Sequence, residues 1–488
     1  MRRGAPAVVA VVAVLAAACA GDAGISTSST ESTATPTEST ESTATPTDTD
    51  DPSPTPTPRN GPIMVAAGPE RETLLLVDPT DGSTRTIEHP AHLVGNPTVL
   101  RGAGGPGGEY AVVITSQDAY VFEVATGAVQ HSSPLGDTLG ASPRPVPEAA
   151  LFVRGDQLTV ADLRTGTIID AGPSDPGLAR LDVDADARTA LVSRGSGGGE
   201  LVDLDAGTSK TIADELFLIG DALDPTGRRV AATRRGSGPV DRQIVVFGVD
   251  DPETMAVWYE PATAEGQLSG YAWTGDVIVA IDFTGRVFVL DGAEPDEIGR
   301  IGDGEVAPFR LHGGETAAAV LASNATPEGE RWYRIDPTSR DIQPLPELDG
   351  LVPLGGERLP DALILGDGDG VSDWSRVVVA PIDVGDAVEI VASDAPQTLS
   401  VTGVGGDVVR VTLIEFRLRT FSYVDAGDGT VVGEGTSSGA MVISPDLGQV
   451  AVVPDGTAPT VVVHELADPA SGREVGAGAA VAWLEDPR

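Results

Sequence analysis

The sequence contains almost no cysteine and almost no lysine. Cys19 is the only cysteine among 488 residues, so an intramolecular disulfide is excluded and the folded state must draw its stability from its core. Lys210 is the only lysine, which makes arginine the source of nearly all positive charge. The 31 basic residues stand against 73 acidic ones, and the formal net charge is −42.

This acidity excludes one class of partner. Nucleic-acid binding depends on clusters of Lys and Arg that displace counterions from phosphates, and a chain this negative repels such backbones. We therefore expect no nucleic-acid partner. The excess of carboxylates is most simply a solubility feature of an exposed protein, although it would also attract cations over long range.

Long amphipathic helices are missing beyond the first twenty residues. Apolar residues make up 41% of the chain, and 60 glycines and 38 prolines accompany them. Glycine and proline favour tight turns, so this composition suits a large core built from many short strands. The expected fold class is all-β.

The first 18 residues have the pattern of a secretory signal peptide. Met1–Arg3 supply positive charge, Ala7–Leu15 form an apolar run, and Ala16–Ala18 are small residues that a signal peptidase accepts. The apolar run is too short to span a bilayer permanently. We predict that residues 1–18 are removed on export.

The segment Leu15-Ala-Ala-Ala-Cys19 resembles the bacterial lipobox, in which the cysteine thiol receives diacylglycerol and becomes the first residue of the mature protein. This resemblance to secreted lipoproteins of actinobacterial type implies that Cys19 is lipidated. The protein would then be exported and lipid-anchored to the outer face of the cell membrane. An ordinary secreted protein with a stray cysteine is the alternative. We favour lipidation because the only cysteine falls at the cleavage point.

Residues 19–59 have the composition of a disordered linker. They are mainly Ser, Thr, Pro, Ala and acidic residues, and the segment Glu31–Thr37 recurs as Glu41–Thr47. Such a stretch cannot bury enough apolar surface to offset the entropy lost on ordering. Extended at about 3.1 Å per residue, it would hold the folded body, residues 60–488, up to roughly 120 Å from the membrane.

The body contains ten copies of a repeat, spaced 39 to 45 residues apart. Its marker is a turn in which an acidic residue follows an apolar strand and a glycine four places later opens the next strand. Glycine supplies the positive φ that a tight reversal needs. The clear copies are Asp78 with Gly82, Glu123 with Gly127, Asp162 with Gly166, Asp203 with Gly207, and Asp425 with Gly429; weaker copies fall at Gly248, Asp291, Asp336, Pro381 and His464.

Each repeat also contains an earlier hairpin, which gives it four short antiparallel strands. Four strands every 40 to 45 residues predict the blade of a β-propeller. The body begins at residues 63–67 with a second strand that lacks a first, and it ends at residues 479–484 with a first strand that lacks a second. Pairing these two would close one ring and remove exposed sheet edges. Ten blades exceed the usual number of about four to eight, so we leave the blade number open.

The earlier hairpins resemble a known repeat family. Ser444–Val452 and Leu223–Ala231 resemble the Ser-Pro-Asp-Gly turn of WD40-like propeller repeats of the TolB type. The acidic-x-x-x-Gly turns resemble the YVTN-type repeats of secreted bacterial propellers. The resemblance covers most of residues 63–485 and implies a propeller fold without implying a function.

Candidate metal chemistry is confined to one loop. Asp367, Asp369 and Asp373 alternate with glycines, and such carboxylates can wrap a hard cation. Calcium is the ion this loop would take, and we expect no other cofactor. Val378 occupies the position at which an EF-hand carries its acidic twelfth residue, so we favour a polar hairpin loop without metal.

Two further patterns lack the context that their chemistry requires. His89 and His92 lie three residues apart, but zinc needs three or four ligands. Ser437 stands in a G-x-S-x-G sequence, but a strand is expected after it where a nucleophile elbow needs a helix. We predict no catalytic residue.

Two functions remain. We expect a non-catalytic binding or scaffolding module for a protein, peptide or carbohydrate at the cell surface, held to the membrane by its lipid anchor. The alternative is a propeller-type hydrolase or lyase with a metal in the central channel. The expected inner strands at 178–182, 268–273 and 441–444 contain no histidine, which favours binding. Fold alone does not decide function.

Overall fold

A computed structural model describes residues 60–486 of the chain. The segments outside the description are 1–59, 69–72, 88–100, 115–117, 135–147, 155, 174–179, 185–187, 219–221, 235–241, 264–265, 293, 303–307, 315, 327–328, 355–358, 360, 368–372, 406–407, 416–417, 438–440, 454–459 and 487–488. The described residues contain 3-10 helices η1 (Pro106–Gly108) and η3 (Pro346–Leu348), and otherwise the elements are strands. No helix among them is long and apolar enough to cross a membrane.

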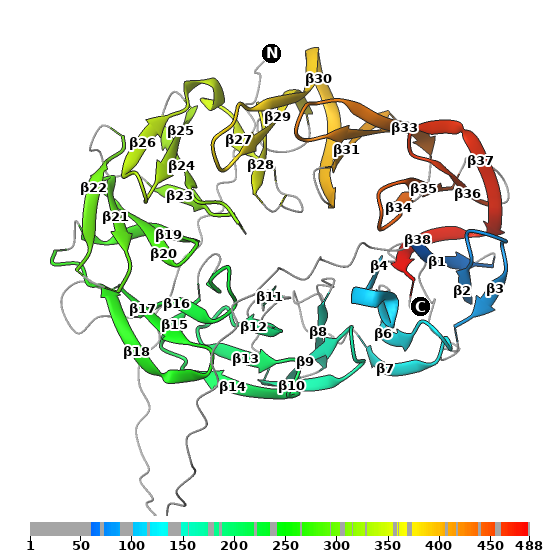
Figure 1. The fold of residues 1–488 in the computed structure, drawn as a ribbon, viewed down its shortest axis with the longest axis horizontal. Helices are drawn as coiled ribbons and strands as arrows, with labels where there is room; N and C mark the ends of the chain where they lie inside the picture. Colours follow the sequence, from blue (N-terminus) through cyan, green and yellow to red (C-terminus); the bar gives the residue numbers. More distant parts are fainter. Residues whose placement is uncertain are drawn as a thin grey trace, which may run out of the picture. The chain divides into compact units, whose positions relative to one another are not determined.

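The strands form antiparallel sheets that follow one another round a ring (Figure 1). We number the sheets as blades in chain order. Blade 1 contains β38 (Ala479–Glu485), β1 (Asn60–Ala67), β2 (Thr73–Val77) and β3 (Thr84–Thr86); blade 2 contains β4 (Arg101–Gly104), β5 (Tyr110–Ile114), β6 (Asp118–Glu123) and β7 (Val129–Pro134); blade 3 contains β8 (Ala149–Arg154), β9 (Gln157–Asp162) and β10 (Ile168–Pro173).

The next four blades are regular. Blade 4 contains β11 (Arg180–Asp184), β12 (Thr189–Ser193), β13 (Gly199–Asp203) and β14 (Thr208–Ile212); blade 5 contains β15 (Leu216–Phe217), β16 (Arg229–Arg234), β17 (Gln243–Gly248) and β18 (Asp251–Tyr259); blade 6 contains β19 (Leu268–Thr274), β20 (Val277–Asp282), β21 (Arg286–Leu290) and β22 (Asp296–Arg300); blade 7 contains β23 (Phe309–His312), β24 (Val320–Thr326), β25 (Gly329–Asp336) and β26 (Asp341–Pro344).

Blades 8 and 9 share a strand. Blade 8 contains β27 (Val352–Pro353), β28 (Ala362–Gly366), β29 (Asp373–Pro381) and the first part of β30 (Val388–Gly405); blade 9 contains the second part of β30, β31 (Val408–Glu415), β32 (Leu418–Asp425) and β33 (Val431–Ser437); blade 10 contains β34 (Met441–Ile443), β35 (Gln449–Val452), β36 (Thr460–Glu465) and β37 (Asp468–Ala477). The described residues therefore form ten blades, which equals the number of repeats in the sequence.

The ring closes through blade 1. The C-terminal strand β38 pairs antiparallel with β1, with Ile63 opposite Trp483 and Asn60 opposite Glu485. The indole nitrogen of Trp483 also donates a hydrogen bond to the backbone oxygen of Gly61 at 3.1 Å. The predicted pairing of the two ends, and with it a single propeller, is confirmed.

Hydrophobic cores lie between the blades. The described residues contain ten buried clusters, and each joins one blade to the next, from blades 1 and 2 round to blades 10 and 1. Successive residues of a strand point to opposite faces of its sheet. In β1, Met64 and Ala66 therefore pack toward blade 2, while Ile63 and Val65 pack toward blade 10. Every blade is buried on both faces, which explains the continuous apolar runs.

The acidic-x-x-x-Gly marker is the turn between the last two strands of a blade, and all ten marked positions lie at or next to such turns. The amide of Gly82 donates to the backbone oxygen of Asp78 at 2.9 Å, and the Asp78 carboxylate accepts the amide of Thr80 at 2.7 Å. Gly82 has a φ of 73°. Blade 7 lacks the glycine, and Arg340 takes the same left-handed conformation with a φ of 60°.

The two ends of the ring differ. Strands alternate in direction within an antiparallel blade, so the turn between the first two strands and the turn between the last two lie at the same end. We call this the turn end. Asn60 lies there too, because its side-chain oxygen accepts the amide of Asp446 in the first turn of blade 10 at 3.3 Å. The first described residue of the body thus lies at the turn end.

Candidate functional site

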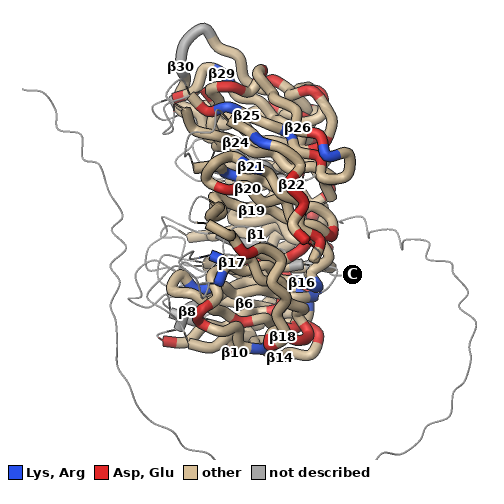
Figure 2. Tube along the Cα trace, turned by 90° about the vertical axis from the view of Figure 1, so that its left-hand side faces the viewer, with Lys and Arg blue, Asp and Glu red and all other residues tan. Residues whose placement is uncertain are grey.

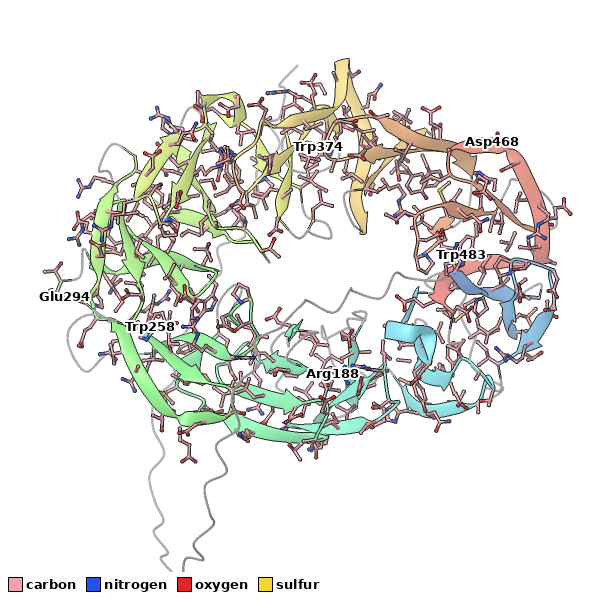
Figure 3. The ribbon with its side chains drawn as sticks, viewed as in Figure 1. Arg188, Trp258, Glu294, Trp374, Asp468 and Trp483 are labelled. Carbon is pink, nitrogen blue, oxygen red and sulfur yellow. The ribbon has the colours of Figure 1, made fainter. Side chains whose placement is uncertain are left out.

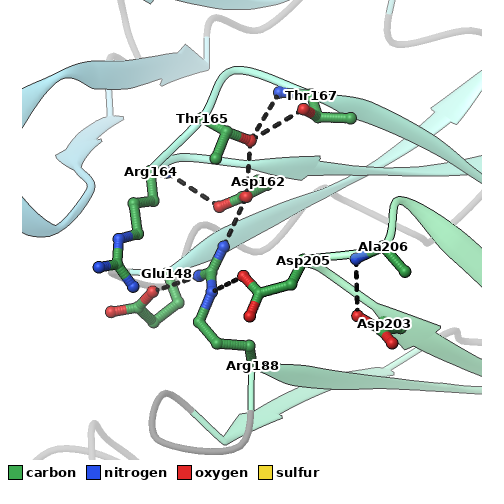
Figure 4. Close-up of polar contacts among 9 residues, drawn as sticks. All are labelled: Glu148, Asp162, Arg164, Thr165, Thr167, Arg188, Asp203, Asp205 and Ala206. Carbon is green, nitrogen blue, oxygen red and sulfur yellow. Dashed lines mark hydrogen bonds and ion pairs between the residues drawn. The ribbon is translucent and has the colours of Figure 1, made fainter.

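Arg188 is the centre of a buried charged cluster at the turn end between blades 3 and 4 (Figure 4). Its guanidinium donates to Glu148 at 2.8 Å, to Asp162 at 2.6 Å and to Asp205 at 3.0 Å. The side chains of Arg188 and Asp162 are 6% and 0% exposed. All three guanidinium nitrogens are occupied by carboxylates. We conclude that this cluster is a structural link between two blades.

The cluster has an excess of negative charge, because three carboxylates interact with the single guanidinium of Arg188. Burial raises the pKa of Glu148, although Arg188 and Arg164 act in the opposite direction. Asp162 also belongs to a repeat turn, where its other oxygen accepts the amide of Arg164 at 2.9 Å. Burial thus disfavours the ionised form of Glu148.

A recess of about 670 Å³ lies between blades 6 and 7. It opens at the turn end, since its lining comes from the first and last turns of both blades. We call it the blade 6–7 recess. Four carboxylates, three threonines and one arginine supply its polar groups: Asp276, Asp291, Glu294, Asp296, Thr274, Thr316, Thr338 and Arg340.

The charge of this recess is negative. Its lining contains four carboxylates and one arginine, and Arg340 pairs with Asp296 at 2.5 Å. Asp276, Asp291 and Glu294 are exposed. Glu294 lies at the outer edge of its blade (Figure 3). The recess can therefore offer carboxylate oxygens to a cationic ligand, and these three charges are not buried before the ligand binds.

A second recess, of about 430 Å³, lies between blades 4 and 5 at the same end. We call it the blade 4–5 recess. Its polar lining is mixed and includes the only lysine of the chain: Lys210, Arg228, Thr189, Thr208, Asp203 and Asp250. The Lys210 ammonium donates to the backbone oxygen of Asp250 at 2.5 Å.

The predicted calcium loop is described only in part. The Asp367 carboxylate accepts the backbone amides of Ser375 and Arg376, each at 2.9 Å. Partial burial raises the pKa of Asp367, but the hydrogen bonds from Ser375 and Arg376 lower it more. Asp373 accepts the hydroxyl of Thr398 at 2.7 Å, and Asp369 lies outside the described residues. The calcium site stays a prediction, since these bonds show only that two of its members also serve the hairpin.

Of the other predicted sites, some lie outside the described residues and one lies within them. Cys19, His89 and His92 lie outside the described residues. Ser437 belongs to β33, where it pairs with Arg419, so the G-x-S-x-G sequence lies on a strand and not at a strand-to-helix turn. Among the described residues no group of three His, Cys, Asp or Glu side chains could hold a metal.

Basic side chains also link neighbouring blades, and the repeat pattern did not predict these links. A basic side chain on an outer strand donates to a backbone oxygen in the last turn of the next blade: Arg473 to Thr80, Arg85 to Val124 and Lys210 to Asp250. Arg85 and Lys210 each stand three residues after a repeat glycine, and Lys210 is forty residues from Asp250. A basic residue three positions after a repeat glycine, about one repeat before its acceptor, is the sequence signal that could have identified these links.

Charged residues are distributed over many blades (Figure 2). The carboxylates at the repeat turns mostly accept backbone amides of their own turn, as Asp203 does from Ala206 at 2.8 Å and Asp425 from Gly427 at 2.7 Å. These aspartates therefore stabilise the fold. Of the acidic groups of the blade 6–7 recess, Asp291 is itself a repeat-turn residue, whereas Asp276, Glu294 and Asp296 stand outside the repeat marker.

Comparison with known proteins shows similarity to solved structures only. No family model matches the chain, and no curated protein matches it. A eukaryotic initiation factor is 8% identical, with 88% of this chain and 99% of that chain covered and a TM-score of 0.49. BamB from Moraxella catarrhalis is 14% identical, with 67% and 93% covered and a TM-score of 0.34.

An oligogalacturonate lyase in complex with manganese is 11% identical, with 84% of this chain and 98% of that chain covered and a TM-score of 0.37. All three scores are low. The propeller assignment therefore rests on the sheet order, the closing strand pair and the cyclic series of inter-blade cores.

Proposed function

We propose that this protein is a membrane-tethered recognition propeller that binds a basic segment of a partner protein or peptide in the blade 6–7 recess. The observation that carries the proposal is the recess itself, a cavity of about 670 Å³ with four carboxylates and a single arginine in its lining. Complementary charge steers a partner to a surface and fixes its register. Three exposed carboxylates at one opening provide such a field locally, in addition to the net charge of the chain.

A peptide of six arginines is a suitable probe. The variant Asp276→Asn/Asp291→Asn/Glu294→Gln removes three charges from the recess, and we expect it to weaken binding of this peptide in calorimetric titration. A matched control, Glu253→Gln/Asp386→Asn/Glu474→Gln, removes three exposed charges from blades 5, 8 and 10. Equal affinity of the two variants would show that only net charge matters, and the recess would be rejected.

The tether completes the proposal. Lipidation of Cys19 and export by residues 1–18 would place the body on the outer face of the cell membrane, with residues 19–59 as linker. Mass spectrometry of the mature protein should find a diacylglyceryl group on Cys19, and Cys19→Ser should release the protein into the medium. An unmodified cysteine in the mature chain would contradict the anchor without affecting the recess.

A further inference from the structure

The blade 4–5 recess is lined by two cationic side chains, Lys210 and Arg228. Lys210 comes from β14 of blade 4, and Arg228 comes from the first turn of blade 5. The ammonium of Lys210 uses one donor on the backbone oxygen of Asp250. No carboxylate of a described residue pairs with the Arg228 guanidinium. Most donors of both side chains therefore remain available.

The backbone holds these two side chains in place. The amide of Arg228 donates to the Asp224 carboxylate at 2.8 Å, and its carbonyl oxygen accepts the amide of Val249 at 2.9 Å. The first and last turns of blade 5, which both line the recess, are thus joined by a backbone hydrogen bond. Lys210 is placed by its strand pairing with Leu201. Two cations on rigid elements of neighbouring blades face one cavity of about 430 Å³.

The same lining contains two carboxylates, those of Asp203 and Asp250, and Lys210 also interacts electrostatically with Asp251. One oxygen of Asp203 is occupied by the amide of Ala206 in the repeat turn. Thr208 adds an exposed hydroxyl that can donate. The blade 6–7 recess lies at the junction two blades further round the ring, and its polar lining is mainly carboxylates. The same architecture therefore carries two recesses of different chemistry.

We propose that the blade 4–5 recess binds a compact oxyanion, a phosphoryl or a carboxylate group, between Lys210 and Arg228. Both groups present several oxygens in a small space, and such oxygens form strong hydrogen bonds with ammonium and guanidinium donors. The net charge of −42 repels anions in general. A saturable response to an anion must then come from a local site and not from general attraction.

The single lysine makes the test specific. Biosynthetic ¹³C-lysine labelling of the full chain, with Cys19→Ser to prevent lipidation, gives one lysine side-chain signal, from Lys210. Sodium phosphate and sodium acetate are titrated separately, with sodium chloride at equal ionic strength as reference. We expect a saturable shift of the Lys210 ¹³Cε signal with at least one of the two oxyanions. Saturation by phosphate alone identifies a phosphoryl site, and saturation by acetate identifies a carboxylate site.

Variants assign the response to the recess. Arg228→Gln should abolish saturation, while Arg310→Gln, which removes an exposed arginine of blade 7, should leave it unchanged. Binding of the six-arginine peptide should not differ between the two variants, so the oxyanion site is tested separately from the proposed function. Shifts that follow those of chloride, or saturation that survives in Arg228→Gln, would overturn the proposal.

Discussion

Removal of Arg188 should strongly destabilise the junction between blades 3 and 4. In Arg188→Met the carboxylate of Asp162, which is 0% exposed, and that of Glu148, which is 15% exposed, lose their common cation. Breaking a buried ion pair by deleting one partner typically costs about 3–5 kcal/mol, because the remaining charge is left without compensation. We expect a loss of this size in the free energy of unfolding.

An exposed pair between blades provides the control. Arg340 and Asp296 are 65% and 42% exposed, and they join blades 6 and 7 at a similar distance. Exposed pairs contribute about 0–1 kcal/mol, so Arg340→Met should be nearly neutral. Urea unfolding followed by tryptophan fluorescence measures both losses. Hydrogen exchange should place the effect of Arg188→Met in β9 and β12.

The loss should also depend on pH, with a definite sign. Burial raises the folded-state pKa of Glu148, so the folded protein binds this proton more readily than the unfolded chain. The contribution of Glu148 to the free energy of unfolding is therefore most favourable at pH values below its ordinary pKa, and it declines as the pH rises through the folded-state pKa. Without Arg188 the folded pKa rises further. The loss in free energy of unfolding caused by Arg188→Met should therefore become smaller as the pH is lowered toward the folded-state pKa of Glu148, because Glu148 is then protonated and needs no cation. A pH-independent loss equal to that of Arg340→Met would refute the reasoning.

Three further outcomes follow from the fold. Sodium chloride should raise the melting temperature in calorimetry, since it screens the repulsion within a chain of net charge −42; a fall would contradict this. Leu484→Ala, at a site that is 0% exposed in the closing strand, should cost about 2–5 kcal/mol in urea unfolding. Val431→Ala, at 49% exposure, should cost less than about 0.5 kcal/mol. Partial burial raises the pKa of Asp446, but bonds from Gly448 and Ser444 lower it more. The contribution of Asp446 to the free energy of unfolding is therefore fully present at pH values above its ordinary pKa and is lost as the pH falls through its lowered pKa. Asp446→Asn should therefore reduce the loss of stability at acidic pH.

The ring architecture could be read from local patterns. Strand alternation and turn glycines act over a few residues, so each repeat carries its own instructions, and the unpaired strands at residues 63–67 and 479–484 implied their own pairing. Even the weakest repeats, at Pro381 and His464, mark real turns. The sharing of β30 between blades 8 and 9 was not foreseen, because no feature of residues 388–405 distinguishes a continuous strand from two strands joined by a loop.

The sites required the tertiary structure. Asp276 and Thr316 line one recess although forty residues separate them, and Lys210 and Arg228 line another only because blade 5 packs against blade 4. Within a repeat, these residues are ordinary polar turn positions. Their chemistry arises from the packing of neighbouring blades, which the rotation of one sheet against the next determines. By itself the sequence determined the blade and the closure of the ring, since these follow from local hydrogen bonding and alternation, whereas the structure established that all ten repeats are blades. Only the tertiary structure, through the packing of each blade against the next, decided which charges face one another across a blade junction.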